Sequence, residues 1–148
     1  PFDHYEETRR VAEAVKIPIA GGECDSSLRM FQWMIENKTV QIAQPDTFYF
    51  GGMIRKIRVA RMAQAAGIEC TPHMSGYGLG FLHVAHFASV VPNAGKFQEF
   101  KGVDEGLPVM SETSNLRSEK GMLKVPTGAG LGVTFDADFV KKAAIIKI

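Results

Sequence analysis

One pattern recurs along the chain: a short apolar run that ends in an ionisable side chain. The runs cover residues 17–23, 40–46, 67–73 and, more weakly, 96–100, and they end in Glu23, Asp46, His73 and Glu99. Successive ionisable residues are 23 to 27 positions apart, and a stretch with helical spacing separates each run from the next. Repeats of this kind indicate strand–helix units that build a parallel sheet. The first run is expected to be a strand buried on both faces.

The segments between the runs carry helix start and stop signals. We expect helices over about 3–16, 25–37, 53–66 and 82–90, and a flexible loop with Gly76, Gly78 and Gly80 that leads into the last of them. Asp3 is the predicted N-cap of the first, with Glu6 completing a capping box. Asp25 or Ser26 is expected to cap the second, which ends near Asn37, and Gly67 ends the third.

The third helix is expected to be amphipathic. Its apolar side chains are predicted to be buried, and they are Ile54, Ile57, Ala60 and Ala63. Its cations are Arg55, Lys56, Arg58 and Arg61. Such a row could bind phosphate, but a solvated outer face is the expected arrangement.

The repeat stops after residue 100. Residues 102–119 are polar and turn-rich, 121–125 can form a short strand, and Asp136 can cap a last helical stretch. We expect this tail, residues 101–148, to pack over the repeats and not to form a separate domain.

Strands that alternate with helices and end in ionisable residues are typical of an α/β protein of the (β/α) barrel class. A complete barrel needs about 250 residues, so four units in a chain of 148 are expected to form half of one. The chain is thus predicted to be a single partial domain over 1–148, about strands five to eight plus the tail. A doubly wound open sheet is the alternative, but its glycine-rich phosphate-binding turn is missing after the first run.

Composition excludes several partners. The formal net charge is +1, from 17 basic and 16 acidic residues, which gives no indication of nucleic-acid or anionic-membrane binding. No apolar run approaches the roughly 18–20 residues that span a bilayer. The two cysteines, Cys24 and Cys70, lie in different repeats and favour a reducing compartment, so we expect a cytoplasmic protein.

The four ionisable residues are expected to meet at one mouth, because neighbouring parallel strands lie about 4.8 Å apart. Asp46 can accept a hydrogen bond from one ring nitrogen of His73, which leaves the other nitrogen to move a substrate proton. Glu99 can act as an acid or hydrogen-bond donor. Glu23 is a candidate ligand for a hard cation, although one carboxylate does not make a magnesium site.

These residues resemble a known family, the enolase superfamily, and its mandelate-racemase-like acid-sugar dehydratases in particular. The motifs are Gly21-Gly22-Glu23, Pro45-Asp46 with Gly51-Gly52, Pro72-His73, Gln98-Glu99-Phe100 and Gly128-Ala129-Gly130-Leu131-Gly132. Their order is specific, although no single motif is. The resemblance covers nearly the whole chain and implies the second half of a (β/α)7β barrel.

The resemblance also implies a reaction. It is the Mg²⁺-assisted removal of the proton α to a carboxylate of a sugar acid, through an enediolate, followed by loss of the β-hydroxyl. Glu23 matches the third metal ligand, on the fifth strand. Asp46 and His73 match a dyad on the sixth and seventh strands in which the histidine is the base. Glu99 matches the eighth-strand acid that bonds the substrate carboxylate or the enediolate.

The departures from the family define what else is expected. Two earlier metal ligands, an Asp and a Glu, are not in the chain, and Pro1 stands where the family has a proline directly after that Glu. We therefore expect the capping domain and the first half of the barrel to be missing from this chain. A homo-oligomer is also expected. Asp46 near the position of a sixth-strand lysine base argues against cycloisomerases.

Two other functions remain open from the sequence. A racemase or epimerase would use the same enolisation but needs a second base, which would come from missing residues. Alternatively, the chain as it stands is a non-catalytic fragment or structural module. The pairs Cys70/His73 and His83/His86 are interpreted as packing and not as zinc sites, because further ligands are not evident.

Overall fold

The chain is seen here in a computed structural model that describes residues 2–74, 78–101 and 109–142. Three expectations fall partly outside the described residues. They concern Pro1, the loop positions 75–77, and the tail segments 102–108 and 143–148.

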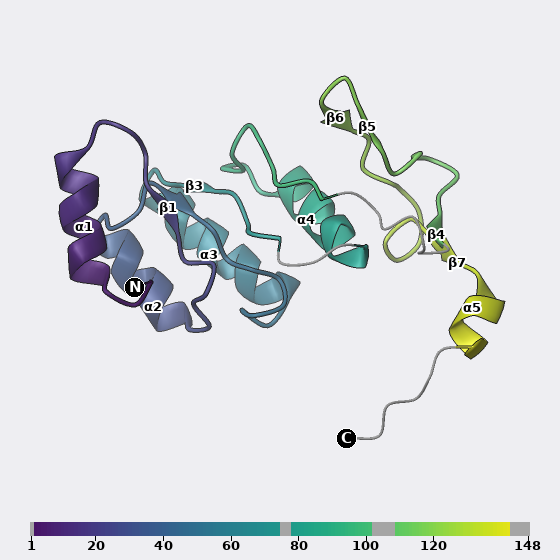
Figure 1. The fold of residues 1–148 in the computed structure, drawn as a ribbon, viewed down its shortest axis with the longest axis horizontal. Helices are drawn as coiled ribbons and strands as arrows, with labels where there is room; N and C mark the ends of the chain where they lie inside the picture. The colour runs from purple at the N-terminus through teal and green to yellow at the C-terminus, as the bar shows by residue number, and fades with distance from the viewer. Residues whose placement is uncertain (1, 75–77, 102–108, 143–148) are drawn as a thin grey trace.

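Three short parallel strands form the sheet that carries the repeat: β1 (Ala20–Gly21), β2 (Ile42–Ala43) and β3 (Glu69–Cys70). They lie in the order β1-β2-β3, with Gly21 opposite Ala43 and Ala43 opposite Cys70. The connections are α2 (Leu28–Glu36) and α3 (Met53–Ala65), which contact each other and therefore cover the same face (Figure 1). The strand–helix repeat predicted from the sequence is confirmed for these units.

The main core lies between this sheet and its helices. Phe31 from α2, Val59 from α3 and Phe87 from α4 (Leu79–Val90) are each 0% exposed, and Ala43 and Cys70 join them from the strands. The first apolar run was expected to be buried on both faces, and this is wrong. Ile17 is 68% exposed, because only 20–21 of that run pairs with a neighbour, and β1 is an edge strand of the described sheet.

The helix starts differ from the predicted ones. The first helix, α1, is Tyr5–Ala14, with His4 as N-cap and no side-chain capping bond, so the capping box from Asp3 does not form. The N-cap of α2 is Ser27, whose hydroxyl accepts from the Arg29 amide at 3.2 Å. Asp25 was one expected cap, but its carboxylate is buried and accepts instead from the Tyr5 hydroxyl.

The buried face of α3 is rotated from the predicted one. Ala60 and Ala63 are buried as expected, but Ile54 is 72% exposed. Lys56, expected in the solvated row of cations, is 0% exposed. Lys56, Ala60 and Ala63 follow the i, i+4, i+7 spacing of one helix face, so the lysine lies on the core side. The predicted end is confirmed, since Ala66 is the C-cap and Gly67 follows with φ +71°.

The fourth strand, expected over 96–100, does not form in the described residues. The segment after α4 leaves the sheet early: the Cys70 amide donates to the Asn93 carbonyl at 2.9 Å, and Phe97 is then 79% exposed. The segment 96–100 makes no strand pairing with β3, so its backbone is irregular. It still places Glu99 beside the residues that follow β3, because the Glu99 carboxylate accepts from the Met74 amide.

The tail contains two antiparallel pairs and a short helix, and it packs on α4. The pairs are β4 (Val109–Met110) with β7 (Thr134–Phe135), and β5 (Ser118–Glu119) with β6 (Met122–Leu123), and the helix is α5 (Ala137–Lys142). Leu116 and Leu123 pack with Phe81 and Leu82 in a second core. Figure 1 shows the tail beyond α4, at the end of the molecule opposite α1. As expected, Asp136 caps α5, accepting from the Asp138 amide at 2.9 Å.

Among the described residues, no helix is long and apolar enough to cross a bilayer.

Gly22 links β1 to the ionisable residue that follows it, and its conformation leaves no room for a side chain. It has φ +102°, and an added Cβ would lie 2.6 Å from the Phe31 ring. Gly67 has φ +71° but open space around it. We therefore expect Gly22→Ala to lower the free energy of unfolding by about 2–5 kcal/mol, from strain plus overpacking, and Gly67→Ala by about 1 kcal/mol.

Urea unfolding of the two variants beside the wild type measures this difference. Equal losses would show that the Gly22–Phe31 contact does not constrain the turn before Glu23.

Candidate active site

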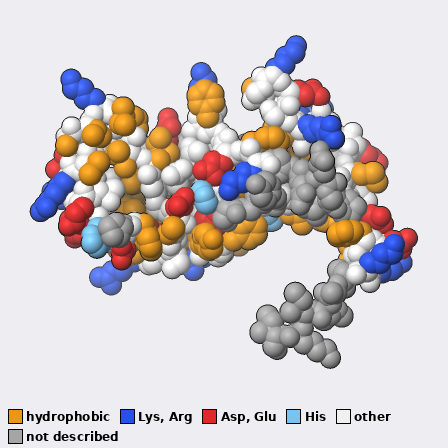
Figure 2. Space-filling view, viewed as in Figure 1, with side chains coloured by type: hydrophobic (Ala, Val, Ile, Leu, Met, Phe, Trp, Pro, Cys, Tyr) orange, Lys and Arg blue, Asp and Glu red, His pale blue; other side chains and the backbone are white. Residues whose placement is uncertain are grey.

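The four ionisable residues from the repeat come together around His73. Three of them lie shortly after a strand: Glu23 after β1, Asp46 after β2 and His73 after β3. Glu99 lies on the irregular segment after α4. Figure 2 shows a histidine among acidic side chains near the middle of the visible face. The carboxyl ends of parallel strands meet at one edge of a sheet, and this brings the side chains together.

Both ring nitrogens of His73 face carboxylates. Nδ1 lies 3.0 Å from Asp46 Oδ2, the contact expected from the sequence. Nε2 lies 3.1 Å from Glu23 Oε2 and 3.9 Å from Glu99 Oε2. The histidine side chain is 19% exposed, so it is largely enclosed but still reaches the surface.

Asp46 is fixed by the loop that follows it. Its side chain is fully buried, and its Oδ1 accepts from the amides of Phe48, at 2.6 Å, and Tyr49, at 2.9 Å. The other oxygen, Oδ2, is left to hold His73 Nδ1. An aspartate that bonds amides two and three residues ahead forms an Asx-type turn, which stabilises both the loop and the orientation of the carboxylate.

Glu99 is anchored by a backbone group of the neighbouring strand end. Its Oε2 accepts from the Met74 amide at 2.8 Å, and its side chain is 36% exposed. Glu99 thereby lies beside the histidine although its segment forms no strand.

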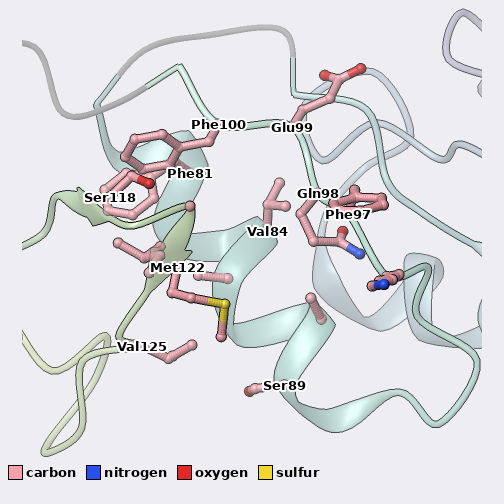
Figure 3. Close-up of a pocket in the computed structure, with 15 residues that line it drawn as sticks. Phe81, Val84, Ser89, Phe97, Gln98, Glu99, Phe100, Ser118, Met122 and Val125 are labelled. Carbon is pink, nitrogen blue, oxygen red and sulfur yellow. The ribbon is translucent and has the colours of Figure 1, made fainter.

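A separate apolar cavity of about 340 Å³ lies on the other side of the segment 96–100. It is enclosed by α4 and the β5–β6 pair, and Figure 3 shows Phe81, Val84 and Met122 in its wall while the Glu99 carboxylate points away. Its lining carries none of the other three ionisable residues, so the chemistry of the site is not in this cavity.

Glu23 is the carboxylate best placed for a cation. Its side chain is 49% exposed, whereas Asp46 and Glu99 hold backbone amides. Glu23 therefore fits the role of one oxygen ligand. In the described part of the chain, no group of three or more His, Cys, Asp or Glu side chains could hold a metal ion. A hard cation takes six or more oxygens, so it would need further ligands besides Glu23.

This arrangement is suited to proton transfer. A carboxylate on Nδ1 fixes the imidazole ring and, when Glu23 moves away from Nε2, favours the tautomer whose Nε2 carries a lone pair. That Nε2 is directed to the mouth formed by Glu23 and Glu99, where a small polar ligand would meet it.

Cys70 and the described histidines other than His73 lie outside the site, whereas the exposed Cys24 thiol donates to Glu23 Oε1 at 3.7 Å. Burial raises the pKa of the Cys70 thiol to about 12, so it is protonated at neutral pH and is a poor zinc ligand. Cys24 is exposed, and both are free thiols. His86 Nε2 lies 3.1 Å from the Leu131 carbonyl, which fits the packing interpretation.

Sequence reasoning missed the supports behind Asp46. Lys56 Nζ donates to Thr47 Oγ1, directly next to the aspartate, and the Met74 amide that holds Glu99 was also not foreseen. Lys56 could have been found from its spacing to Ala60 and Ala63. The backbone donors could not, because every residue except proline has an amide.

The comparisons with known proteins agree with the resemblance. An arabinonate dehydratase from Saccharolobus solfataricus is 26% identical over 132 residues, which are 89% of this chain and 35% of that protein. A D-galactonate dehydratase from Ralstonia pickettii is 29% identical over 143 residues, 93% of this chain and 37% of that protein. The chain thus spans little more than a third of the length of these curated relatives.

Solved structures share the fold. The 3,6-anhydro-D-galactonate cycloisomerase from Zobellia galactanivorans superposes with a TM-score of 0.77 at 26% identity, covering 95% of this chain and 40% of that one. A mandelate racemase/muconate lactonizing enzyme-like protein from Roseovarius sp. TM1035 has a TM-score of 0.81 at 26% identity, with coverages of 95% and 35%.

Residues 1–139 match the family model described as enolase C-terminal domain-like. The chain therefore belongs to this family, as a C-terminal part of its barrel.

Proposed function

We propose that the protein carrying this chain is a Mg²⁺-dependent dehydratase of a sugar acid. The observation that supports this most is the enclosed His73, held through Nδ1 by a buried aspartate with Nε2 directed to the mouth. Relatives named arabinonate dehydratase and D-galactonate dehydratase support sugar acids as the substrate class.

The first step assigned to this chain is a proton transfer. The C–H bond α to the substrate carboxylate breaks, its proton goes to His73 Nε2, and the electron pair moves onto the carboxylate carbon and oxygens. Asp46 Oδ2, 3.0 Å from Nδ1, stabilises the imidazolium that forms. Glu23, 3.1 Å from Nε2, has to move away from the ring for the substrate to approach.

The second step is loss of the β-hydroxyl. The electron pair of the enediolate forms a double bond between the α- and β-carbons, and the β C–O bond breaks. The departing hydroxide takes a proton and leaves as water, and the product is an enol. His73 carries the proton just removed and can supply it. The enol then tautomerises to a 2-keto-3-deoxy acid, so atoms and charge balance without an oxidant.

Glu99 is assigned to the substrate oxygens. Its Oε2 accepts from the Met74 amide, so its Oε1 can carry a proton towards the carboxylate that gains charge during enolisation. A hydrogen bond that strengthens as this charge develops lowers the barrier.

Glu23 is assigned as one ligand of Mg²⁺. A bound divalent cation would stabilise the negative charge on the substrate carboxylate. The other oxygen ligands would come from a part of the protein outside this chain, as would the capping domain and most of the contacts that select the sugar acid.

A racemase of the same class would return the proton from a second base on the opposite side of the substrate. Product analysis separates the two reactions: dehydration gives a keto acid, whereas racemisation gives an isomer with unchanged composition.

The first prediction concerns the base. His73→Asn in the whole protein, assayed with Mg²⁺ against a panel of sugar acids, should lower kcat about 10²–10⁴-fold, because a positioned general base contributes that much. His4→Asn is the matched control and should leave kcat unchanged. His4 is the exposed N-cap residue of α1 and takes no part in the site. Undiminished turnover in the His73 variant would reject the assigned base.

The second prediction concerns the metal. Glu23→Gln should raise the Mg²⁺ concentration for half-maximal binding about tenfold or more, because a charged oxygen ligand is lost. Glu36→Gln, an exposed change at the end of α2, should leave it unaltered. Calorimetric titration with Mg²⁺ measures both without requiring turnover, and equal affinities in the two variants would remove Glu23 from the metal site.

A further inference from the structure

Lys56 is a buried cation bonded to Thr47, the residue that follows Asp46. It lies on α3, is 0% exposed, and its Nζ donates to the Thr47 hydroxyl and lies 4.8 Å from the centre of the Phe87 ring. A buried ammonium is costly unless hydrogen bonds and opposite charge offset the lost hydration. The position therefore requires a compensating interaction.

The loop that orients Asp46 is tied to the same helix. The Phe50 amide donates to the Asp46 carbonyl at 3.2 Å, and the Gly52 amide donates to the Thr47 carbonyl at 2.9 Å. The Lys56 amide then donates to the Gly52 carbonyl at 3.3 Å, as α3 begins. Lys56 thus contacts the loop through its backbone and, through Nζ, at the residue next to Asp46.

We propose that Lys56 is a positioning residue for His73. Its ammonium group fixes Thr47, and with it the loop that orients Asp46, and its positive charge balances the Asp46 carboxylate. The inference rests on the proposed role of His73 as the base, which it deepens by adding a cation that acts on Asp46, the partner of His73.

The charges around Lys56 support this role. Burial lowers the pKa of Lys56 to about 8, and the negative charge of Asp46 opposes that shift. The other titratable groups near Lys56 are Cys70 on β3 and His83 on α4. The pKa of His83 is lowered by burial and by the charge of Lys56. The helix α2 also packs against α3, and its buried side chains are all apolar: Phe31, Met34 and Ile35.

A consequence follows for the histidine. Above about pH 8 the folded protein loses the Lys56 charge. The Asp46 carboxylate is then less compensated, so its field at His73 increases. The signals of the His73 ring should therefore report an extra step near pH 8 that belongs to Lys56.

The test is NMR of the whole protein with ¹³C-labelled histidine, in which His73 is assigned by the signal that H73N removes. Wild type should show the step near pH 8. Lys56→Arg, with a permanent charge, and Lys56→Met, with none, should both lack it. Lys16→Met, an exposed site after α1, is the control and should retain it.

Kinetics add a second readout. Lys56→Met should lower kcat about tenfold to a hundredfold with KM within about twofold, because misplacing a reacting group by about 1 Å costs that much. Lys56→Arg should recover part of the loss, and Lys16→Met should match the wild type.

The outcomes separate this inference from the proposed function. A wild type without the extra step, or a step that persists in Lys56→Met, overturns the inference even if the enzyme dehydrates sugar acids. A wild type with the step but without any turnover rejects the proposed function and leaves the Lys56 inference supported. Should Lys56→Met fail to fold, wild type against Lys56→Arg still decides.

Discussion

The contact between Asp46 and His73 is the interaction on which the rest of the site depends, and the register of the sheet produces it. Ala43 on β2 pairs with Cys70 on β3, and Asp46 and His73 each follow their strand residue by three positions. Gly21 pairs with Ala43, and Glu23 follows it by two. Equal lengths of chain beyond the Ala43–Cys70 pair bring Asp46 and His73 together, and Glu23 follows one residue earlier, so a shift of register would separate these side chains.

This arrangement requires a charged aspartate to be buried, and the structure stabilises it on several sides. Two loop amides donate to one oxygen, His73 contacts the other, and Lys56 stands behind the loop. Hydrogen bonds to a charged group each contribute about 1.5–3 kcal/mol, which offsets much of the lost hydration. The same contacts restrict the imidazole to one orientation, so stability and the proposed chemistry have a common origin.

The sequence was sufficient to predict those features of the fold that depend on hydrophobic periodicity and on residues that end helices and strands. The parallel strand–helix units, the end of α3 at Gly67 and the gathering of Glu23, Asp46, His73 and Glu99 were predicted. The burial of Lys56 was not predicted, because a charged side chain was expected to face solvent although its spacing to Ala60 and Ala63 places it on the buried face of α3. The absent fourth strand was missed because residues 96–100 have strand-like composition, and pairing depends on a partner that local sequence does not specify. The backbone donors to Asp46 and Glu99 depend on loop geometry, which composition does not encode.

The central claim is that His73 Nε2 takes the proton α to a carboxylate. A crystal structure of the whole protein with Mg²⁺ and a non-reacting sugar acid tests it most directly, through the distance from that nitrogen to the α-carbon. The account predicts about 3–3.5 Å, the separation of reacting atoms before proton transfer, with the Asp46 contact on Nδ1 retained and Glu23 turned to the metal. A clearly longer distance, with the α-carbon facing a side chain other than His73, would contradict it.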